Sequence, residues 1–246
     1  MDWGAHVATA AACAVVGALG GWLVPRLVVR LPEPALTQGQ AQPPKPPKPL
    51  YADLAKTPGL APKSAAWAAL AAGLIGLGTG WSWSLLFLIP LVPIGVALGF
   101  VDFKARLLPT RLIAPSYLLV IAGVLVVTVL TGDLTVLRWA AIGWACAGGL
   151  FWFLWRFTRG MGYGDVRLSG GLGLALGHLG WGELLVGLYA AFVLGAVGWI
   201  PLRLLKITTD RKVPFGPFML LGAVVGILWG ADVAGYLAGY LAGGQG

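Results

Sequence analysis

The sequence predicts an all-α, polytopic integral membrane protein with about eight transmembrane helices, and three observations support this fold class. First, 58% of the 246 residues are hydrophobic and only 11% are charged, whereas an average soluble domain has roughly 25% charged residues. Second, apolar runs of about 20 residues recur along the chain, which is the length that a helix needs to cross the hydrocarbon core. Third, the basic residues gather in the short segments between these runs. Because lipid offers no partners to backbone polar groups, the runs are expected to be helices.

The apolar runs give eight candidate spans, with a seven-span alternative. They are residues 6–25, 65–81, 83–101, 112–131, 136–157, 166–181, 183–203 and 216–236. The sixth run is short, and only a Gly/Trp turn separates it from the seventh. With eight spans, all Lys and Arg residues except Arg138 fall in four loops or their helix ends. An excess of Lys and Arg marks cytoplasmic loops, so both termini are expected outside. The net charge of +8 then reflects membrane topology, and no nucleic-acid partner is expected.

The chain divides into a first transmembrane helix at residues 1–30, a Pro-rich cytoplasmic loop at 31–64 and a membrane domain at 65–246. The loop contains QAQPPKPPKPLY, whose prolines oppose helix formation and favour an extended path. A linker is the favoured interpretation, and a docking arm is the alternative. Glycines at four-residue spacing, such as Gly173 with Gly177, predict close contacts between helices. The two cysteines, Cys13 and Cys146, lie in apolar runs and are expected to be buried, without a disulfide or metal site.

Two acidic residues, Asp102 and Asp165, have no ordinary explanation. The other seven fall at a terminus, in loops or near the predicted external surface, whereas an ionisable residue at the edge of an apolar span usually has a task. Two spans separate Asp102 from Asp165, so both carboxyl groups should lie near the cytoplasmic surface at similar depth. Two close carboxyl groups share a proton. One can then take a proton from water while the other polarises an amide carbonyl, as in aspartic proteolysis.

Simpler roles for both aspartates remain open from the residues alone. Asp165 could be an N-terminal cap that accepts backbone N–H groups, and Asp102 could form an interfacial ion pair with Lys104 or Arg106. Under the proteolytic interpretation, the glycines that precede Asp165 would clear space for water and for an extended substrate backbone.

Three sequence motifs resemble those of the type IV prepilin peptidases, which are integral-membrane aspartic proteases. GYGDVRL is similar to the GxGD motif of that family, VDFKARLLPTRLIAPSYLL to its first catalytic segment, and VPFGPFMLLGA to its Pro-Phe-Gly-Pro-Phe stretch. GALGGWLVPRLVVRLPEP is a weaker relative of its N-terminal segment. The motifs occur in the order that the family has.

The resemblance implies a catalytic pair, a substrate class and a location. Asp102 and Asp165 would be the catalytic residues, working without a cofactor, and Gly162, Tyr163, Gly164 and Pro109 would shape the site or contact substrate. Pilin-like precursors would enter laterally from the lipid bilayer and lose a short basic leader after a glycine. The protein would be a multi-pass protein of a bacterial cytoplasmic membrane, cleaving at the cytoplasmic face.

The sequence departs from the family pattern at two places. Many members carry two CxxC motifs in the first cytoplasmic loop, a zinc-ligand spacing linked to N-methylation of the product, but residues 31–64 contain no cysteine. Methylation, with S-adenosylmethionine as its cofactor, is therefore in doubt, and no metal site is expected. Thr110 also stands where Asp commonly follows the Leu-Pro.

Two other functions are alternatives. A transporter or assembly scaffold could use the two aspartates for proton handling or partner contact, but it would be expected to show an internal repeat and charges near mid-membrane. A presenilin-like GxGD protease is disfavoured by the Pro-Phe-Gly-Pro-Phe stretch. The basic residues that flank the aspartates are expected mainly to anchor the topology: Lys104, Arg106, Arg111, Arg159 and Arg167. His6 and His178 are expected toward the external side, without a role.

Overall fold

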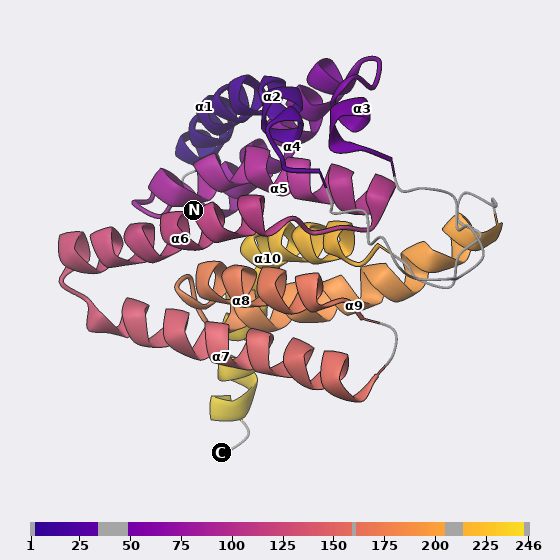
Figure 1. The fold of residues 1–246 in the computed structure, drawn as a ribbon. Helices are drawn as coiled ribbons and strands as arrows, with labels where there is room; N and C mark the ends of the chain where they lie inside the picture. The colour runs from indigo at the N-terminus through magenta and orange to yellow at the C-terminus, as the bar shows by residue number, and fades with distance from the viewer. Residues whose placement is uncertain (1–2, 34–48, 159–160, 205–213, 244–246) are drawn as a thin grey trace.

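The structure, a computed structural model, describes residues 3–33, 49–158, 161–204 and 214–243, and these ranges are all-α (Figure 1). The helices are α1 (Trp3–Trp22), α2 (Val24–Val29), α3 (Tyr51–Ala55), α4 (Leu60–Thr79), α5 (Leu85–Ala105), α6 (Thr110–Thr131), α7 (Leu134–Phe157), α8 (Tyr163–Gly177), α9 (Trp181–Leu204) and α10 (Gly216–Gly243).

Seven helical segments among the described residues are long and apolar enough to cross a membrane. They comprise α1 with α2, then α4, α5, α6, α7, α9 and α10. The predicted sixth span appears as α8, which has only 15 residues. At a rise of 1.5 Å per residue, α8 is about 22 Å long, shorter than a hydrocarbon core of about 30 Å. The chain is thus a multi-pass, all-α membrane protein with one short helix inside its bundle.

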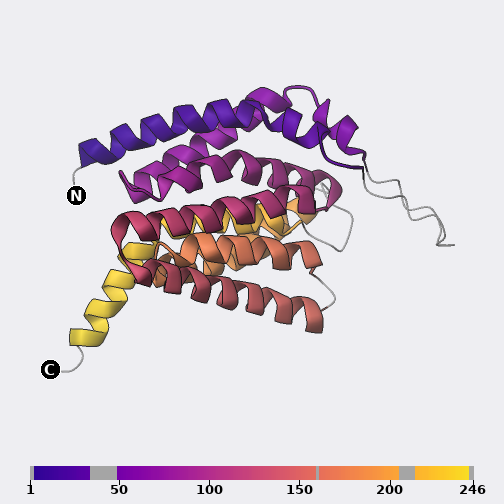
Figure 2. The ribbon, with the colours of Figure 1, turned by 60° about the vertical axis from the view of Figure 1, so that its left-hand side comes forward.

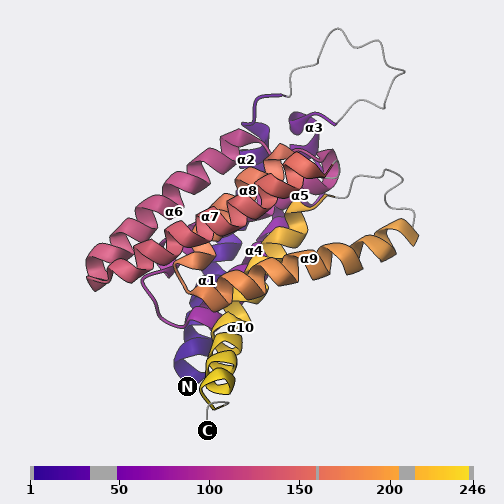
Figure 3. The ribbon, with the colours of Figure 1, turned by 90° about the horizontal axis from the view of Figure 1, so that it is seen from below.

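Successive helices run in alternating directions, which determines what lies at each end of the bundle. The start of α1 and the end of α10 lie at one end (Figures 2 and 3). The end of α5 and the start of α8 lie at the opposite end (Figure 2). This alternation brings together the segments that contain the two aspartates singled out from the sequence.

Glycines hold the α7–α8 and α9–α10 pairs at backbone contact. A Cβ on Gly143 of α7 would overlap the carbonyl oxygen of Gly173 in α8, and the next turn of α8, at Gly177, packs against the same glycine. Gly222, Gly226 and Gly230 of α10 lie in the same way against residues 182–191 of α9. The prediction of glycine-mediated helix contacts is therefore confirmed, because only a residue without a side chain lets two backbones come this close.

The described ends of the predicted Pro-rich loop are structured, while residues 34–48 lie outside the described residues. The Glu33 carboxylate accepts hydrogen bonds from the backbone N–H groups of Tyr51 and Ala52, both at 2.9 Å. These bonds satisfy two of the unpaired N–H groups at the start of α3. Tyr51 is buried in a cluster with residues of α2 and the end of α5. The following helix, α4, begins at Leu60, five residues earlier than its predicted span.

The structure corrects the prediction for one cysteine and gives one histidine a structural position. Cys13 is buried, but Cys146 is exposed on α7, because the apolar face of a membrane helix can point toward lipid as readily as toward the protein. His178 is buried, with its Nε2 at 2.8 Å from the Ser84 hydroxyl and its Nδ1 at 2.7 Å from the Ala175 carbonyl. His178 thus links α8 to the start of α5, at the end of the bundle opposite the aspartates.

The α7–α8 contact can be tested with a matched pair of glycines on α7. Gly143→Ala places a methyl group on the Gly173 carbonyl, so we expect the free energy of unfolding in detergent to fall by about 1–3 kcal/mol, as for other overpacked sites. The control is Gly149→Ala, since nothing lies within 4 Å of a Cβ at Gly149. Equal stability of the two variants would contradict the backbone contact.

Candidate active site

Asp102 lies in the last turn of α5, and its side chain is 5% exposed. The helix ends three residues later because Arg106 takes a left-handed conformation with φ of 53°. That conformation is uncommon for a residue other than glycine. The chain then turns through Leu107–Pro109 into α6. The apolar helix α5 thus has a buried carboxyl group in its last turn.

A backbone N–H at the start of α10 holds the Asp102 carboxyl group. The Gly216 N–H donates to Asp102 Oδ2 at 2.9 Å, in a buried hydrogen bond that spans 114 residues. A Cβ on Gly216 would lie 2.7 Å from the same oxygen. The first N–H groups of a helix have no partner within it and carry partial positive charge. Asp102 is therefore a hydrogen-bond acceptor for the N-terminus of α10.

Asp165 lies in the first turn of α8 and is 8% exposed. Its Oδ2 accepts a hydrogen bond from the Gly162 N–H at 2.9 Å, so the capping contact considered from the sequence is present. A cap in solvent would meet the same requirement, but this carboxyl group is buried. The burial of Asp165 next to a second acidic residue goes beyond what capping alone requires.

The two carboxyl groups lie at the same end of the bundle, at the end of α5 and the start of α8, and the contact of Gly164 with Leu108 joins these two segments. Arg106, one of the two predicted ion-pair partners of Asp102, is the left-handed residue that ends α5. Lys104, the other predicted partner, is exposed, with its ammonium group 6.0 Å from the centre of the Phe103 ring. The site thus contains two buried acidic side chains at one end of the bundle, each with one oxygen bound to a backbone N–H. Such a pair can exchange protons with a water molecule or a bound amide.

The glycines before Asp165 have a local packing role. A Cβ on Gly164 would lie 2.8 Å from Cβ of Leu108, in the segment that joins α5 to α6. Pro109 is the half-buried N-cap residue of α6 and follows Leu108 directly. The space that the sequence assigned to water and substrate is therefore filled, at Gly164, by the Leu108 side chain. This contact fixes the start of α8 against the segment that follows Asp102.

Aromatic and basic side chains cover the start of α8. Tyr163 is 46% exposed, its ring centre lies 5.0 Å from that of Trp155, and the Arg167 guanidinium lies 4.7 Å from the Tyr163 ring centre. Arg167 also donates to the hydroxyl of Thr110. Thr110, the residue that departs from the family pattern, thus contacts the helix that carries Asp165. Arg111 is exposed, and Arg159 lies outside the described residues.

Gly216 has no role among the predictions from the sequence, although it lies in the Pro-Phe-Gly-Pro-Phe stretch. Three phenylalanine rings position this glycine: Phe215 packs against Phe151 of α7 and Phe192 of α9, with ring centres 5.8 and 5.6 Å away. The usable signal was a glycine at the start of an apolar helix, where a free N–H can bind an anion. What the sequence could not reveal was which acidic residue would occupy that position.

The fold and the site define a polytopic helical membrane protein with two acidic side chains buried at one end of its bundle. The type IV leader peptidase family matches residues 89–200, a range that contains both Asp102 and Asp165. This match over residues 89–200 confirms the resemblance to that family drawn from the motifs.

Several curated proteins are similar to the chain over this region. The prepilin leader peptidase/N-methyltransferase of Stutzerimonas stutzeri is 32% identical over 174 residues, which are 68% of this chain and 58% of the relative. Proteins of the same name from Aeromonas hydrophila and Burkholderia pseudomallei (strain 1026b) are each 36% identical, over 65% and 66% of this chain and 55% and 52% of their own lengths. The chain thus spans little more than half of these relatives. No solved structure matches the chain.

The packing of α8 against α6 gives a double-mutant test. Tyr117 of α6 donates from its hydroxyl to the Arg167 carbonyl at 2.8 Å, and a Cβ on Gly170 would overlap that hydroxyl. We expect Gly170→Ala to lower the free energy of unfolding by about 1–3 kcal/mol and Tyr117→Phe by about 1 kcal/mol. Since the clash needs both groups, the double variant should be more stable than the sum of the two losses implies. Additive losses in thermal unfolding would refute the contact.

Proposed function

We propose that the chain is a membrane aspartic endopeptidase that removes the short basic leader of pilin-like precursors. In this proposal the cleaved bond follows a glycine, and the site faces the cytoplasm from a bacterial cytoplasmic membrane. One observation carries the proposal: Asp102 and Asp165 are both buried at the same end of the bundle, within the region that matches the leader peptidase family. The names of the similar proteins agree with this activity.

The proposed mechanism uses the two carboxyl groups as one acid–base unit. The Oδ2 atoms of Asp102 and Asp165 each accept a hydrogen bond from a backbone N–H, so we assign the other oxygen of each group to the reacting water and amide. The ionised partner takes a proton from water as the water oxygen attacks the scissile carbonyl carbon. The protonated partner donates to the carbonyl oxygen and stabilises the tetrahedral intermediate. Collapse of that intermediate breaks the C–N bond: the carboxyl group that took the proton from water gives it to the leaving amine, and the other carboxylate takes back its proton from the former carbonyl oxygen.

The position of the pair suits a substrate that is itself a membrane helix. Asp102 is in the last turn of one helix and Asp165 in the first turn of another, so both lie near the membrane surface and not at its centre. A pilin-like precursor has a polar leader followed by an apolar helix, and its leader boundary would lie at the same depth. A transporter that carried protons on these residues would be expected to hold them nearer mid-membrane.

Proteolysis of this kind needs no cofactor, and the proposal covers cleavage alone. S-adenosylmethionine would be needed only for N-methylation, the second activity in the names of the relatives. The chain has no cysteines between positions 31 and 64.

Replacing either aspartate by asparagine should stop cleavage, because the amide can neither give nor take the proton. We expect Asp102→Asn and Asp165→Asn each to lower cleavage of a co-expressed pilin precursor by about 10²–10⁴-fold. The matched control is Asp133→Asn, an exposed cap residue of α7 at the opposite end of the bundle. Membrane-inserted Asn variants that still process the precursor at the control rate would refute the assignment and favour a transporter or scaffold.

The Gly216 contact gives an independent prediction. Gly216→Ala places a methyl group 2.7 Å from Asp102 Oδ2, so the carboxyl group or the start of α10 must shift. We expect kcat/KM for precursor cleavage to fall by about tenfold or more, since displacement of a reacting group by a fraction of an ångström is costly. Gly235→Ala, on the same helix with nothing within 4 Å of its Cβ, should cleave at the wild-type rate. Unchanged cleavage by Gly216→Ala would show that this bond does not position Asp102.

A further inference from the structure

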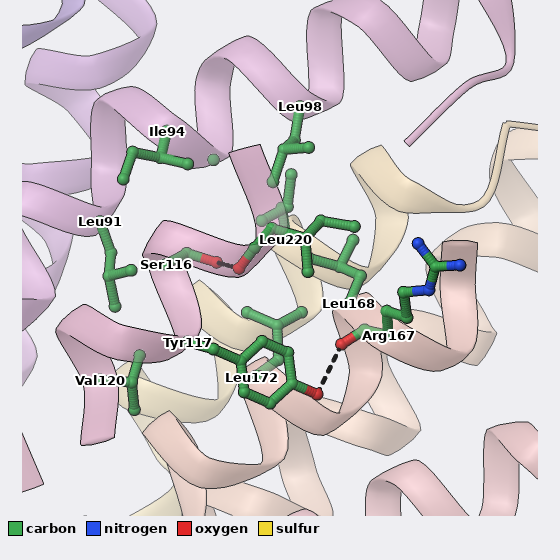
Figure 4. A pocket seen from close by; sticks show the side chains of 13 residues that line it. Leu91, Ile94, Leu98, Ser116, Tyr117, Val120, Arg167, Leu168, Leu172 and Leu220 are labelled. Carbon is green, nitrogen blue, oxygen red and sulfur yellow. Dashed lines mark hydrogen bonds between the residues drawn. The ribbon is translucent and has the colours of Figure 1, made fainter. Parts of the chain in front are cut away.

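An apolar cavity lies between α5, α6, α8 and α10 (Figure 4). Its volume is about 60 Å³, several times the roughly 10–15 Å³ that a single water needs. The cavity therefore has room for several carbon atoms. Neither the fold nor the proposed chemistry accounts for it.

The cavity walls are built from the same helix faces that carry the site. Leu98 precedes Asp102 by four residues on α5, Leu168 follows Asp165 by three on α8, and Leu220 follows Gly216 by four on α10; all three line the cavity. Residues three or four apart lie one above the other on a helix. Each site residue thus has a leucine one helical turn away, on the side toward the middle of its span. The cavity therefore lies one turn from the carboxyl groups, along the same helix faces.

The remaining walls are apolar carbon with a polar rim. Ser116 and Tyr117 of α6 line the cavity, and the Ser116 hydroxyl donates to the Ile113 carbonyl of its own helix. The Tyr117 hydroxyl donates to the Arg167 carbonyl, as Figure 4 shows. Leu220 reaches into the space over α5 because Gly95 has no side chain: a Cβ there would lie 3.3 Å from Leu220 Cδ2. With these hydroxyl hydrogens already bonded, the cavity suits an apolar group.

We infer that this cavity is the binding site for a bulky apolar side chain of the substrate, from the first or second residue after the cleaved bond. This inference rests on the proposed function. One helical turn corresponds to 5.4 Å along the helix axis, and an extended backbone advances about 3.3 Å per residue. A substrate whose scissile carbonyl lies between the carboxyl groups therefore presents one of these two side chains to the cavity. Because consecutive side chains of an extended segment point to opposite sides, only one of the two enters.

The cavity also gives the membrane helix of the substrate a means of alignment. The leader side of the bond is polar and the mature side apolar, so an apolar cavity below the carboxyl groups sets the direction in which the chain lies across them. Discrimination by side-chain size then follows from the fit, at about tenfold or more per misplaced methylene group in a hydrophobic pocket.

The test is a size profile measured with a reporter precursor made of a short basic leader, a glycine and a leucine-rich helix. Ala, Leu, Phe and Trp are placed at the first position after the glycine and, separately, at the second. We expect wild-type kcat/KM to depend on side-chain size at one of these positions only. Ser116→Phe, which fills the cavity from α6, should shift the preference at that position toward Ala by about tenfold. Leu220→Ala, which enlarges the cavity, should shift it toward Trp.

The control is Leu118→Phe, which adds an aromatic ring on the same helix at a side chain that is 70% exposed. It should leave the profile unchanged. If Ser116→Phe and Leu220→Ala both cleave with the wild-type profile, the cavity does not hold a substrate side chain and the inference is wrong, while the proposed function stands. Cleavage that survives Asp102→Asn would instead overturn the proposed function.

A cross-linking experiment tests occupancy without cleavage. In Asp102→Asn with Cys146→Ser, which removes the exposed native thiol, Ser116→Cys should form a disulfide with a reporter cysteine at one of the two positions. Leu118→Cys should not, because that side chain is 70% exposed and does not line the cavity. Equal cross-linking from both positions, or none from position 116, would overturn the inference.

Discussion

Burying two carboxyl groups at the end of a helical bundle is the constraint on which the rest of this structure depends. An unpaired buried carboxylate is costly in free energy, and this chain meets the cost with backbone N–H groups. Asp102 uses the N-terminus of α10, and Asp165 uses Gly162 at the N-terminus of α8. Both donors come from helix starts, where N–H groups have no partner within the helix. The acidic pair therefore needs α8 and α10 to begin at the same depth as the end of α5.

Close contacts at glycines, both at the site and farther along the helices, make that arrangement possible. Gly216 and Gly164 remove side chains that would strike Asp102 and Leu108, so the helix starts can approach α5 closely. Farther along the helices, Gly143 and Gly173 set the α7–α8 separation, while Gly187 and Gly226 set that of α9 and α10. Because α8 and α10 each carry part of the site, these distant contacts also determine the position of the acidic residues.

Sequence reasoning could predict the fold class, the order of the long helices and the common depth of Asp102 and Asp165, because hydropathy and charge bias set these features. It placed the glycine contacts correctly for the same reason: their spacing follows the helical period. It was wrong about Cys146, since an apolar helix does not reveal which face meets lipid. It also could not assign Gly216 or the cavity lined by Leu98, Leu168 and Leu220, because both arise from contacts between residues more than 50 positions apart.

The hydrogen bonds that Glu33 accepts from Tyr51 and Ala52 make the geometry of the membrane domain independent of the length of the Pro-rich stretch. The two ends of that stretch are joined by hydrogen bonds across eighteen positions and buried against α5 through Tyr51. Because these contacts hold the two ends beside each other, the residues between them can differ in number or kind while α2, α3 and α5 keep their positions.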